Sequence, residues 1–511
     1  MTAAAQPATV QMGTAQGRWV LFATVLGSGL AMLDASVVNV ALERIGTELD
    51  AGFSGLQWTI NAYTLALAAL ILLGGSLGDR FGRRRVFIIG VVWFATASLL
   101  CGLAPNIGTL VAARALQGVG GALLTPGSLA IISASFHGAD RAAAVGAWSG
   151  LGGVAAAMGP FLGGWLVDWN WRTVFLVNLP VAALIVMVAA RHVPESRDAD
   201  ATPRLDLAGT ALAVLGLGAM TYALTAAGER GASPTVVALG ALGVAGLVMF
   251  VVVERRSTHP LVPTALFRDA QFSAANAVTL FVYAALGVLF VLLVLHLQVV
   301  AGFSPLLAGS ALLPLTVIML MFSARVGALA QRTGPRLLLT GGPLVSAVGV
   351  LLMFRIEADA SYVLDVLPAV TVFGAGLALT VAPLTATVLD SAADRYAGVA
   401  SGVNNAVARA AGLLAVAVVP VVAGIGGNDY TNPDAFGPSF RTALLIIAGL
   451  LVASAVVAFG LIRRSLAVAA EAVQGEPVDV TAVRRIRLEE CAHCGITGPQ
   501  VHPHQPVGSP R

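Results

Sequence analysis

The sequence has 511 residues, of which 57% are hydrophobic and only 11% are charged. Soluble proteins usually carry about a quarter charged residues, so this chain lacks the polar surface that several soluble domains of this total length need. All 29 basic residues are arginine and the net charge is +3, without a dense basic tract for nucleic acid. The composition therefore predicts a protein that is embedded in lipid.

Apolar segments long enough to cross a bilayer recur along the whole chain. Residues 1–17 are polar or small, and the apolar run that Arg18 opens is too long for a cleaved signal. Because about 20 apolar residues span the hydrocarbon core, we predict fourteen transmembrane helices. Residues 270–324 contain no charge and exceed one span, so a turn is placed at the AGFSP segment, 301–305. The predicted spans are 18–42, 57–77, 86–104, 109–132, 144–166, 174–190, 206–226, 235–253, 273–298, 306–325, 337–355, 363–388, 397–424 and 441–462.

The arginines indicate how the chain is oriented in the membrane. An even number of spans places both termini on one side, and most arginines fall on the cytoplasmic side if the N-terminus is inside. The absence of lysine and the abundance of Ala, Val, Gly and Arg suggest a bacterial genome of high GC content. We therefore predict a multi-pass protein of the bacterial inner membrane with both termini in the cytoplasm. The longest outer loop is expected at 425–440 and the longest inner loop at 254–272.

Two predicted inner loops match at an offset of 252 residues. GSLGDRFGRR at 75–84 and GALAQRTGPR at 327–336 share the pattern G-x-L-x-[DQ]-R-x-G-x-R. Each follows a helix that runs inward, which favours a duplicated six-helix bundle with two extra helices between the copies. The predicted division is 1–17 (cytoplasmic tail), 18–204 (six-helix bundle), 205–254 (two inserted helices), 255–464 (six-helix bundle) and 465–511 (cytoplasmic tail).

Ionisable residues inside spans are the first candidates for function. Asp34 lies in the first span, Arg114 in the fourth and Arg409 in the thirteenth, and each costs about 2.5–3.5 kcal/mol to insert at the bilayer centre. We interpret Asp34 as a proton carrier facing an apolar cavity, where desolvation disfavours its charge, with Arg114 as the residue that tunes it. The alternative is a static ion pair that holds two helices together.

The first loop copy is a candidate conformational latch. Its glycines allow a tight turn between antiparallel helices, and its charges can pair with neighbouring helix ends. The alternative is that its arginines only set the topology, but Asp79 is poorly explained by topology. The latch residues are Gly75, Asp79, Arg80, Gly82, Arg83 and Arg84.

The fifth span is rich in glycine around a proline. Small residues allow close helix packing in lipid, and an internal proline removes one backbone hydrogen bond. Close packing and a bending seam between two conformations are both open. The residues of this segment are Gly152, Gly159, Pro160, Gly163 and Gly164.

Polar and aromatic residues in or near the spans are candidates for contact with an amphipathic substrate, although each could instead anchor a helix at the interface. They are Asn39, Trp58, Asn61, Tyr63, Gln117, Gln298, Asn404, Asn405 and Arg409.

Five segments together resemble the fourteen-helix drug:proton antiporters of the major facilitator superfamily. They are LDASVVNVAL at 33–42, GSLGDRFGRR at 75–84, RALQGVGG at 114–121, GPFLGG at 159–164 and WRTVF at 171–175. Glu43 stands where a proline is usual, and Gln331 replaces the aspartate of the second loop copy. The resemblance runs from about residue 18 to 464 and implies the all-α major facilitator fold. It also implies export of small cationic or amphipathic compounds driven by inward proton flow, with the arginine of the fourth-helix motif in proton transfer.

Other classes fit less well. A Walker A loop needs a lysine, and the chain has none. An enzyme would need a catalytic cluster, but H-E-x-x-H does not occur and the histidines cluster only in the C-terminal tail. No channel filter motif is visible either. An exporter dedicated to one endogenous metabolite or lipid remains open.

The expected partners are a small-molecule substrate, protons and the lipid bilayer. We expect no nucleic acid, no cofactor and a functional monomer. Cys491, His493 and Cys494, with His502 and His504, could ligate zinc, but without a structured partner loop no metal site is predicted.

Overall fold

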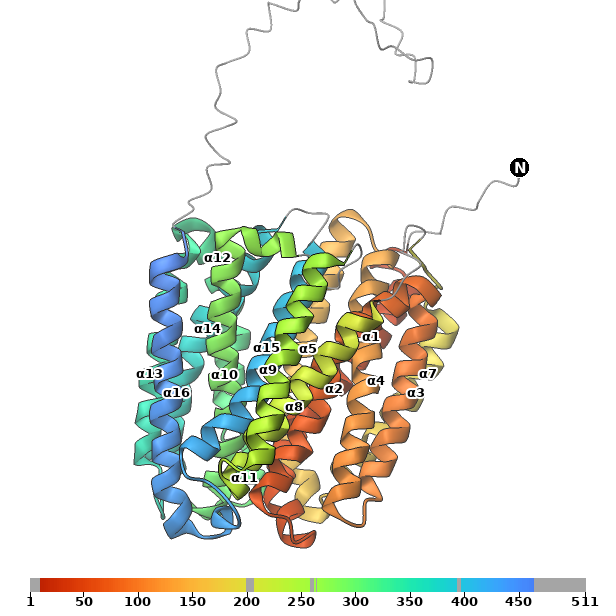
Figure 1. The fold of residues 1–511 in the computed structure, drawn as a ribbon. Coiled ribbons are helices and arrows are strands. Elements are labelled where there is room, and N and C mark those ends of the chain that lie inside the picture. Colours follow the sequence, from red (N-terminus) through yellow and green to blue (C-terminus); the bar gives the residue numbers. More distant parts are fainter. Residues whose placement is uncertain (1–9, 199–205, 258–261, 263, 393–396, 464–511) are drawn as a thin grey trace, which may run out of the picture. The chain divides into compact units, whose positions relative to one another are not determined.

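The computed structural model describes residues 10–198, 206–257, 262, 264–392 and 397–463. In this part of the chain all regular secondary structure is helical, and the long helices run side by side (Figure 1). Thirteen of the described helices are long and apolar enough to cross a membrane. The predicted fifth span is occupied by a further helix of 32 residues, so a helix or a pair of consecutive helices covers every predicted span.

The predicted N-terminal bundle corresponds to the first seven helices. They are α1 (Ala15–Glu48), α2 (Phe53–Phe81), α3 (Arg83–Gly102), α4 (Ile107–Ser135), α5 (Gly138–Trp169), α6 (Thr173–Leu176) and α7 (Asn178–His192). The short α6 and α7 together occupy the predicted sixth span. We call these helices the N-group.

Two helices follow as the predicted inserted pair, α8 (Leu207–Arg230) and α9 (Pro234–Arg256). The remaining elements, which we call the C-group, are η1 (Thr264–Arg268), α10 (Ala270–Val299), α11 (Pro305–Ser310), α12 (Leu313–Thr333), α13 (Pro335–Leu352), η2 (Met353–Arg355), η3 (Tyr362–Val366), α14 (Leu367–Asp390), α15 (Ala397–Val422), η5 (Asp429–Thr431) and α16 (Pro433–Leu461).

The turn predicted at 301–305 is confirmed, because α10 ends at Val299 and α11 begins at Pro305. The start of the last span was predicted wrongly. α16 begins at Pro433, so the proline lies in the first helical turn. The Asn432 side chain caps this end of the helix by accepting a hydrogen bond from the Asp434 backbone N–H. Proline suits the first helical turn because its missing N–H has no intrahelical partner there. The loop predicted at 425–440 is correspondingly shorter.

The two groups pack in the same pattern. In the N-group, α1 contacts α5 and α7, α4 contacts α2 and α3, and α3 contacts α7. The equivalent contacts in the C-group join α10 to α15 and α16, α14 to α12 and α13, and α13 to α16. The repeated loops also share a backbone feature, since Gly82 and Gly334 both have positive φ (113° and 80°) between two helices. The division into domains stays a prediction, with which this packing agrees.

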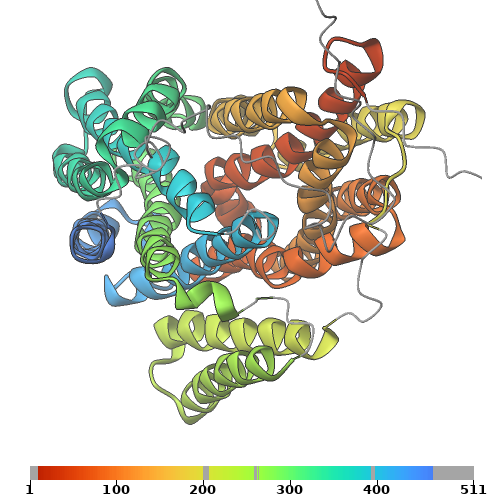
Figure 2. The same cartoon turned by 90° about the horizontal axis from the view of Figure 1, so that it is seen from above.

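The described helices of the two groups meet mainly through α5 with α11, α2 with α15, and α1 with α10. Smaller contacts join α5 to α12 and α1 to α11. The inserted pair packs through α8 on both α2 and α15, and so covers the line where these two helices meet. Figure 2 shows α8 and α9 as a yellow-green pair beside the other helices.

Candidate functional site

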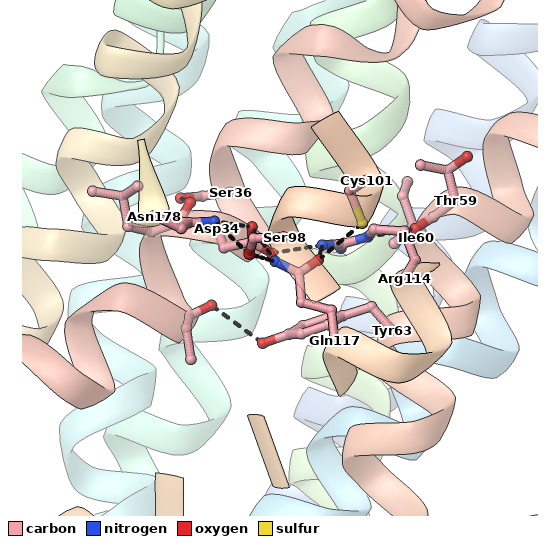
Figure 3. Close-up of polar contacts among 12 residues, drawn as sticks. Asp34, Ser36, Thr59, Ile60, Tyr63, Ser98, Cys101, Arg114, Gln117 and Asn178 are labelled. Carbon is pink, nitrogen blue, oxygen red and sulfur yellow. Dashed lines mark hydrogen bonds and ion pairs between the residues drawn. The ribbon is translucent and has the colours of Figure 1, made fainter. Parts of the chain in front are cut away.

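The carboxylate of Asp34 lies at the centre of a buried polar cluster (Figure 3). Its Oδ2 accepts a hydrogen bond from Arg114 Nη1 at 2.6 Å. Its Oδ1 accepts from Gln117 Nε2 and from Asn178 Nδ2, both at 2.8 Å. Asp34 is 0% and Arg114 1% exposed. The expectation of an apolar environment for Asp34 is therefore wrong, because three polar side chains surround its carboxylate.

The guanidinium of Arg114 is held from several sides. Its Nε donates to the Thr59 carbonyl at 2.9 Å, and Nη1 donates also to Gln117 Oε1 at 2.7 Å. Its Cζ lies 4.4 Å from the centre of the Tyr63 ring, in a cation–π arrangement. Such a planar donor fork fixes orientation in a way that a lysine cannot.

Ser98 completes the cluster. Its Oγ accepts from Gln117 Nε2 at 2.7 Å and from Asn178 Nδ2 at 3.2 Å. The cluster thus draws on α1 (Asp34), α3 (Ser98), α4 (Arg114, Gln117) and α7 (Asn178). Ser98 and Asn178 were not among the predicted site residues, and their one sequence signal is weak, a neutral polar side chain inside an apolar span.

The candidate substrate residues of the N-group fall into two sets, those in the Asp34 cluster and those with unpartnered buried amide atoms. Tyr63 and Gln117 belong to the Asp34 cluster, and the Tyr63 hydroxyl donates to the Ala31 carbonyl at 3.3 Å. Asn61 is 0% exposed, and neither atom of its amide has a hydrogen-bond partner among the described residues. The Asn39 Oδ1 is likewise buried and unpartnered there. Buried amides without a partner are rare, so Asn61 and Asn39 remain candidates for contact with water or substrate.

The candidates of the C-group lie on α15. Asn404 Nδ2 donates to Thr279 Oγ1 at 2.7 Å and to Asn276 Oδ1 at 3.2 Å, which makes a second polar cluster with α10. Asn405 Oδ1 accepts from Arg409 Nε at 3.1 Å.

The glycines of the fifth-span motif bring α5 close to two neighbours. A Cβ atom at Gly159 or Gly163 would collide with α1, at Ser36 and Val37. A Cβ at Gly164 would collide with the backbone of α11 at Leu306. α5 thus packs closely on α1 within the N-group and on α11 of the C-group. The environment of Gly152 lies outside the described residues.

The loop after α2 is clasped by the segment that follows α7. Arg83 Nε and Asp79 Oδ1 form an ion pair at 2.7 Å, and Glu195 Oε1 accepts from the Arg84 N–H at 3.1 Å. Glu195 Oε2 lies 3.6 Å from Arg85 Nε. Gly75 faces Pro126 of α4, and Arg80 lies over the neighbouring Phe81 ring. These contacts stay within the N-group, and Glu195 is a partner that the sequence analysis missed.

The hydrogen bonds between the two groups in the described structure cluster toward one face. Gln57 Nε2 donates to the Val416 carbonyl at 2.7 Å, and Gln298 Nε2 to the Val40 carbonyl at 3.2 Å. Gln298 thus bridges the groups, whereas Trp58 packs on Tyr222 of α8, with ring centres 6.1 Å apart. These residues all lie near helix ends that the predicted topology places on the outer side of the membrane.

The predicted tail cluster around Cys491, His493 and Cys494 lies outside the described residues. Within the described residues, no group of three or more His, Cys, Asp and Glu side chains could hold a metal ion.

A bundle of membrane-crossing helices with a polar cluster inside each of its two groups is typical of a multi-pass membrane transporter. The comparisons agree. Residues 24–416 match the model of the Major Facilitator Superfamily, and the chain belongs to that family. It is therefore a transporter of small molecules and not an enzyme.

Relatives with related names match most of the chain. The puromycin resistance protein pur8 of Streptomyces alboniger is 37% identical, over 87% of this chain and 91% of the relative. The multidrug resistance protein Stp of Mycobacterium tuberculosis is 37% identical over 76% and 72%. The probable actinorhodin transporter of Streptomyces coelicolor is 35% identical over 86% and 79%.

Solved structures support the fold. A peptide transporter POT in complex with sulfate superposes with a TM-score of 0.64 at 17% identity, covering 90% of this chain and 98% of that one. This likeness concerns the fold alone.

Proposed function

We propose that this protein is a proton-driven exporter of small amphipathic or cationic compounds, such as antibiotics, that works by alternating access. The observation that carries the proposal is the buried ion pair of Asp34 and Arg114. An ionised carboxylate inside a membrane protein is costly unless it is compensated, and here three donors compensate it.

The geometry supports a role for this pair in proton exchange. Protonation of Asp34 would remove its charge and weaken the bonds from Arg114, Gln117 and Asn178, because hydrogen bonds to a charged group are the strong ones. The Arg114 guanidinium could then form hydrogen bonds with other acceptors. A change of charge on one atom is thereby linked to the positions of α1, α4 and α7, which is the kind of link that coupled transport needs.

The inter-group contacts support a state that is closed on the outside. Gln57 and Gln298 hold the two groups together near the ends that we assign to the outer face. The arginines of the first loop copy and Arg255 and Arg256 support the assignment of the opposite face to the cytoplasm. We accordingly propose that both termini are cytoplasmic, in a bacterial inner membrane, and that a monomer suffices for transport.

The names of two relatives support export of toxic compounds, because one is named for resistance to puromycin and the other for multidrug resistance. The probable actinorhodin transporter represents export of one compound. The breadth of this protein's substrates is therefore a matter for experiment.

The test uses the full chain in liposomes with an imposed pH gradient and a pH-sensitive dye inside. We expect ethidium, or an antibiotic from a small panel, to evoke proton flux in wild type and in Glu43→Gln, a carboxylate change elsewhere on α1. We expect no evoked flux in Asp34→Asn. Equal flux in Asp34→Asn and wild type would refute the proton-carrier role. Flux with only one compound of a broad panel would favour a dedicated exporter.

A further inference from the structure

A large cavity lies between the inserted pair and the rest of the protein. Its volume is about 910 Å³, at the upper end of the range of about 300–1,000 Å³ that is typical of ligand pockets. Its walls come from α2, α8, α9 and α15, the helices at the line where the two groups meet. The walls are apolar, with Leu72, Leu217, Phe250 and Val407 as the larger side chains and Ala69 and Ala406 as small ones.

One end of this cavity is charged. Arg255, in the last turn of α9, and Arg268, in η1, both line it and both are exposed. Within the described residues, no hydrogen bond or ion pair involves either guanidinium. Glu254 also lines this end, but it is 2% exposed and its Oε2 accepts a hydrogen bond from the Val262 N–H at 2.9 Å. The charge that the cavity presents to a ligand is therefore positive.

We propose that this cavity binds an anionic phospholipid, with acyl chains among α2, α8, α9 and α15 and its phosphate between Arg255 and Arg268. Apolar walls suit acyl chains, and a basic end between membrane helices suits a lipid headgroup. The planar fork of an arginine matches phosphate oxygens. Arg255 lies where α9 ends, at the level at which a headgroup sits when its chains lie along a membrane helix.

The site has a structural consequence. The bound lipid would touch the inserted pair and both groups at once, because the cavity walls include α8, α2 and α15. An anionic lipid would then hold α8 and α9 against the line where the groups meet. This role requires neither the proton nor the exported compound, so it stands apart from the proposed function.

Native mass spectrometry of the full chain, released from detergent with defined lipids, tests the proposal. Wild type is mixed with phosphatidylglycerol or with phosphatidylethanolamine, which has no net charge. We expect retention of phosphatidylglycerol in preference to phosphatidylethanolamine. Arg255→Gln with Arg268→Gln should weaken that retention about tenfold or more. The control Arg256→Gln removes the neighbouring charge, which does not line the cavity, and should leave retention unchanged.

Cavity filling provides the second arm. Ala406→Phe should block the acyl chains and abolish retention, whereas Leu215→Phe, at a position that is 67% exposed on α8, should not. Each variant is first checked for a single peak in size-exclusion chromatography. If the double arginine variant fails this check, the two single variants replace it. Equal retention of both lipids, equal weakening by Arg256→Gln, or full retention in Ala406→Phe would each overturn the proposal.

Discussion

The hydroxyl group of Tyr430 donates a hydrogen bond to the backbone carbonyl oxygen of Ala51, 2.6 Å away, across a sequence separation of 379 residues. The bond joins the loop between α1 and α2 to the loop between α15 and α16. The Phe53 N–H donates to the Gly427 carbonyl at 2.7 Å beside it. Burial raises the pKa of the Tyr430 hydroxyl, as do Glu43 and Asp50, so this group stays a donor at physiological pH. Two loops from different groups are thus fastened together.

Tyr430→Phe should loosen this fastening without leaving a large cavity. Loss of one buried hydrogen bond costs about 0.5–1.5 kcal/mol, so the amide of Phe53 should exchange with deuterium several-fold faster. Hydrogen–deuterium exchange with mass spectrometry of the peptide around Phe53 measures this. Tyr222→Phe, on the partly exposed α8, is the control and should leave that peptide unchanged. Identical exchange in wild type and Tyr430→Phe would show that the bond does not hold the loops.

Arg114→Lys should impair transport although it keeps the charge. A lysine cannot donate to Thr59, Asp34 and Gln117 in the geometry of the guanidinium. Because a hydrogen bond to a charged group contributes about 1.5–3 kcal/mol, we expect substrate-evoked proton flux to fall about tenfold or more. Arg44→Lys, at an exposed position of α1, is the control. Wild-type flux in Arg114→Lys would mean that charge alone matters there.

Gly164→Ala and Gly146→Ala form a matched pair on α5. A Cβ at Gly164 meets the backbone of Leu306, while one at Gly146 meets no atom within 4 Å. Overpacking costs about 1–3 kcal/mol, so Gly164→Ala should lower the melting temperature and slow transport. Gly146→Ala should be neutral or stabilise by up to about 1 kcal/mol through helix propensity. Thermal unfolding in detergent compares the two, and equal melting temperatures would contradict the close packing of α5 on α11.

Glu195→Gln should weaken the clasp on the loop after α2. The change keeps an acceptor for the Arg84 N–H but removes the charge that faces Arg84 and Arg85. Partly exposed ion pairs contribute about 0.2–1 kcal/mol, and salt screens them. Wild type should therefore be slightly more stable to unfolding than Glu195→Gln at low salt, and this difference should shrink at high salt. Glu229→Gln, at an exposed position, is the control. If wild type stays more stable than Glu195→Gln by the same amount at high salt, packing and not charge accounts for the difference.

Much of the fold could be predicted from the sequence because a bilayer demands long apolar segments. The charge-free stretch at 270–324 was divided correctly at Pro305, since proline and glycine mark a turn wherever hydropathy continues unbroken. The match between 75–84 and 327–336 also identified two backbone turns that share a positive φ. The start of α16 was missed because Pro433 and the polar residues after it resemble a loop in hydropathy, although they form the first turns of a helix.

The site was less predictable, because hydropathy does not indicate which faces of helices meet. Asp34 and Arg114 stood out because charge is rare in spans, and the structure pairs them. Ser98 and Asn178 did not stand out, since a neutral polar residue in an apolar run is common. Glu195 and Tyr430 were missed for another reason. Both lie outside the predicted spans, and their partners are distant in the sequence.

The Asp34 cluster has one further consequence. Its members sit on α1, α3, α4 and α7, and none comes from the C-group. A rigid swing of one group against the other therefore leaves the distance between Asp34 and Arg114 unchanged. The pair can separate only through a local event, such as a rotamer change of Arg114 or the arrival of a proton or a water molecule. Under the proposed mechanism, rocking of the groups would decide which compartment supplies the proton, and side-chain rearrangement would decide when Asp34 binds and releases it.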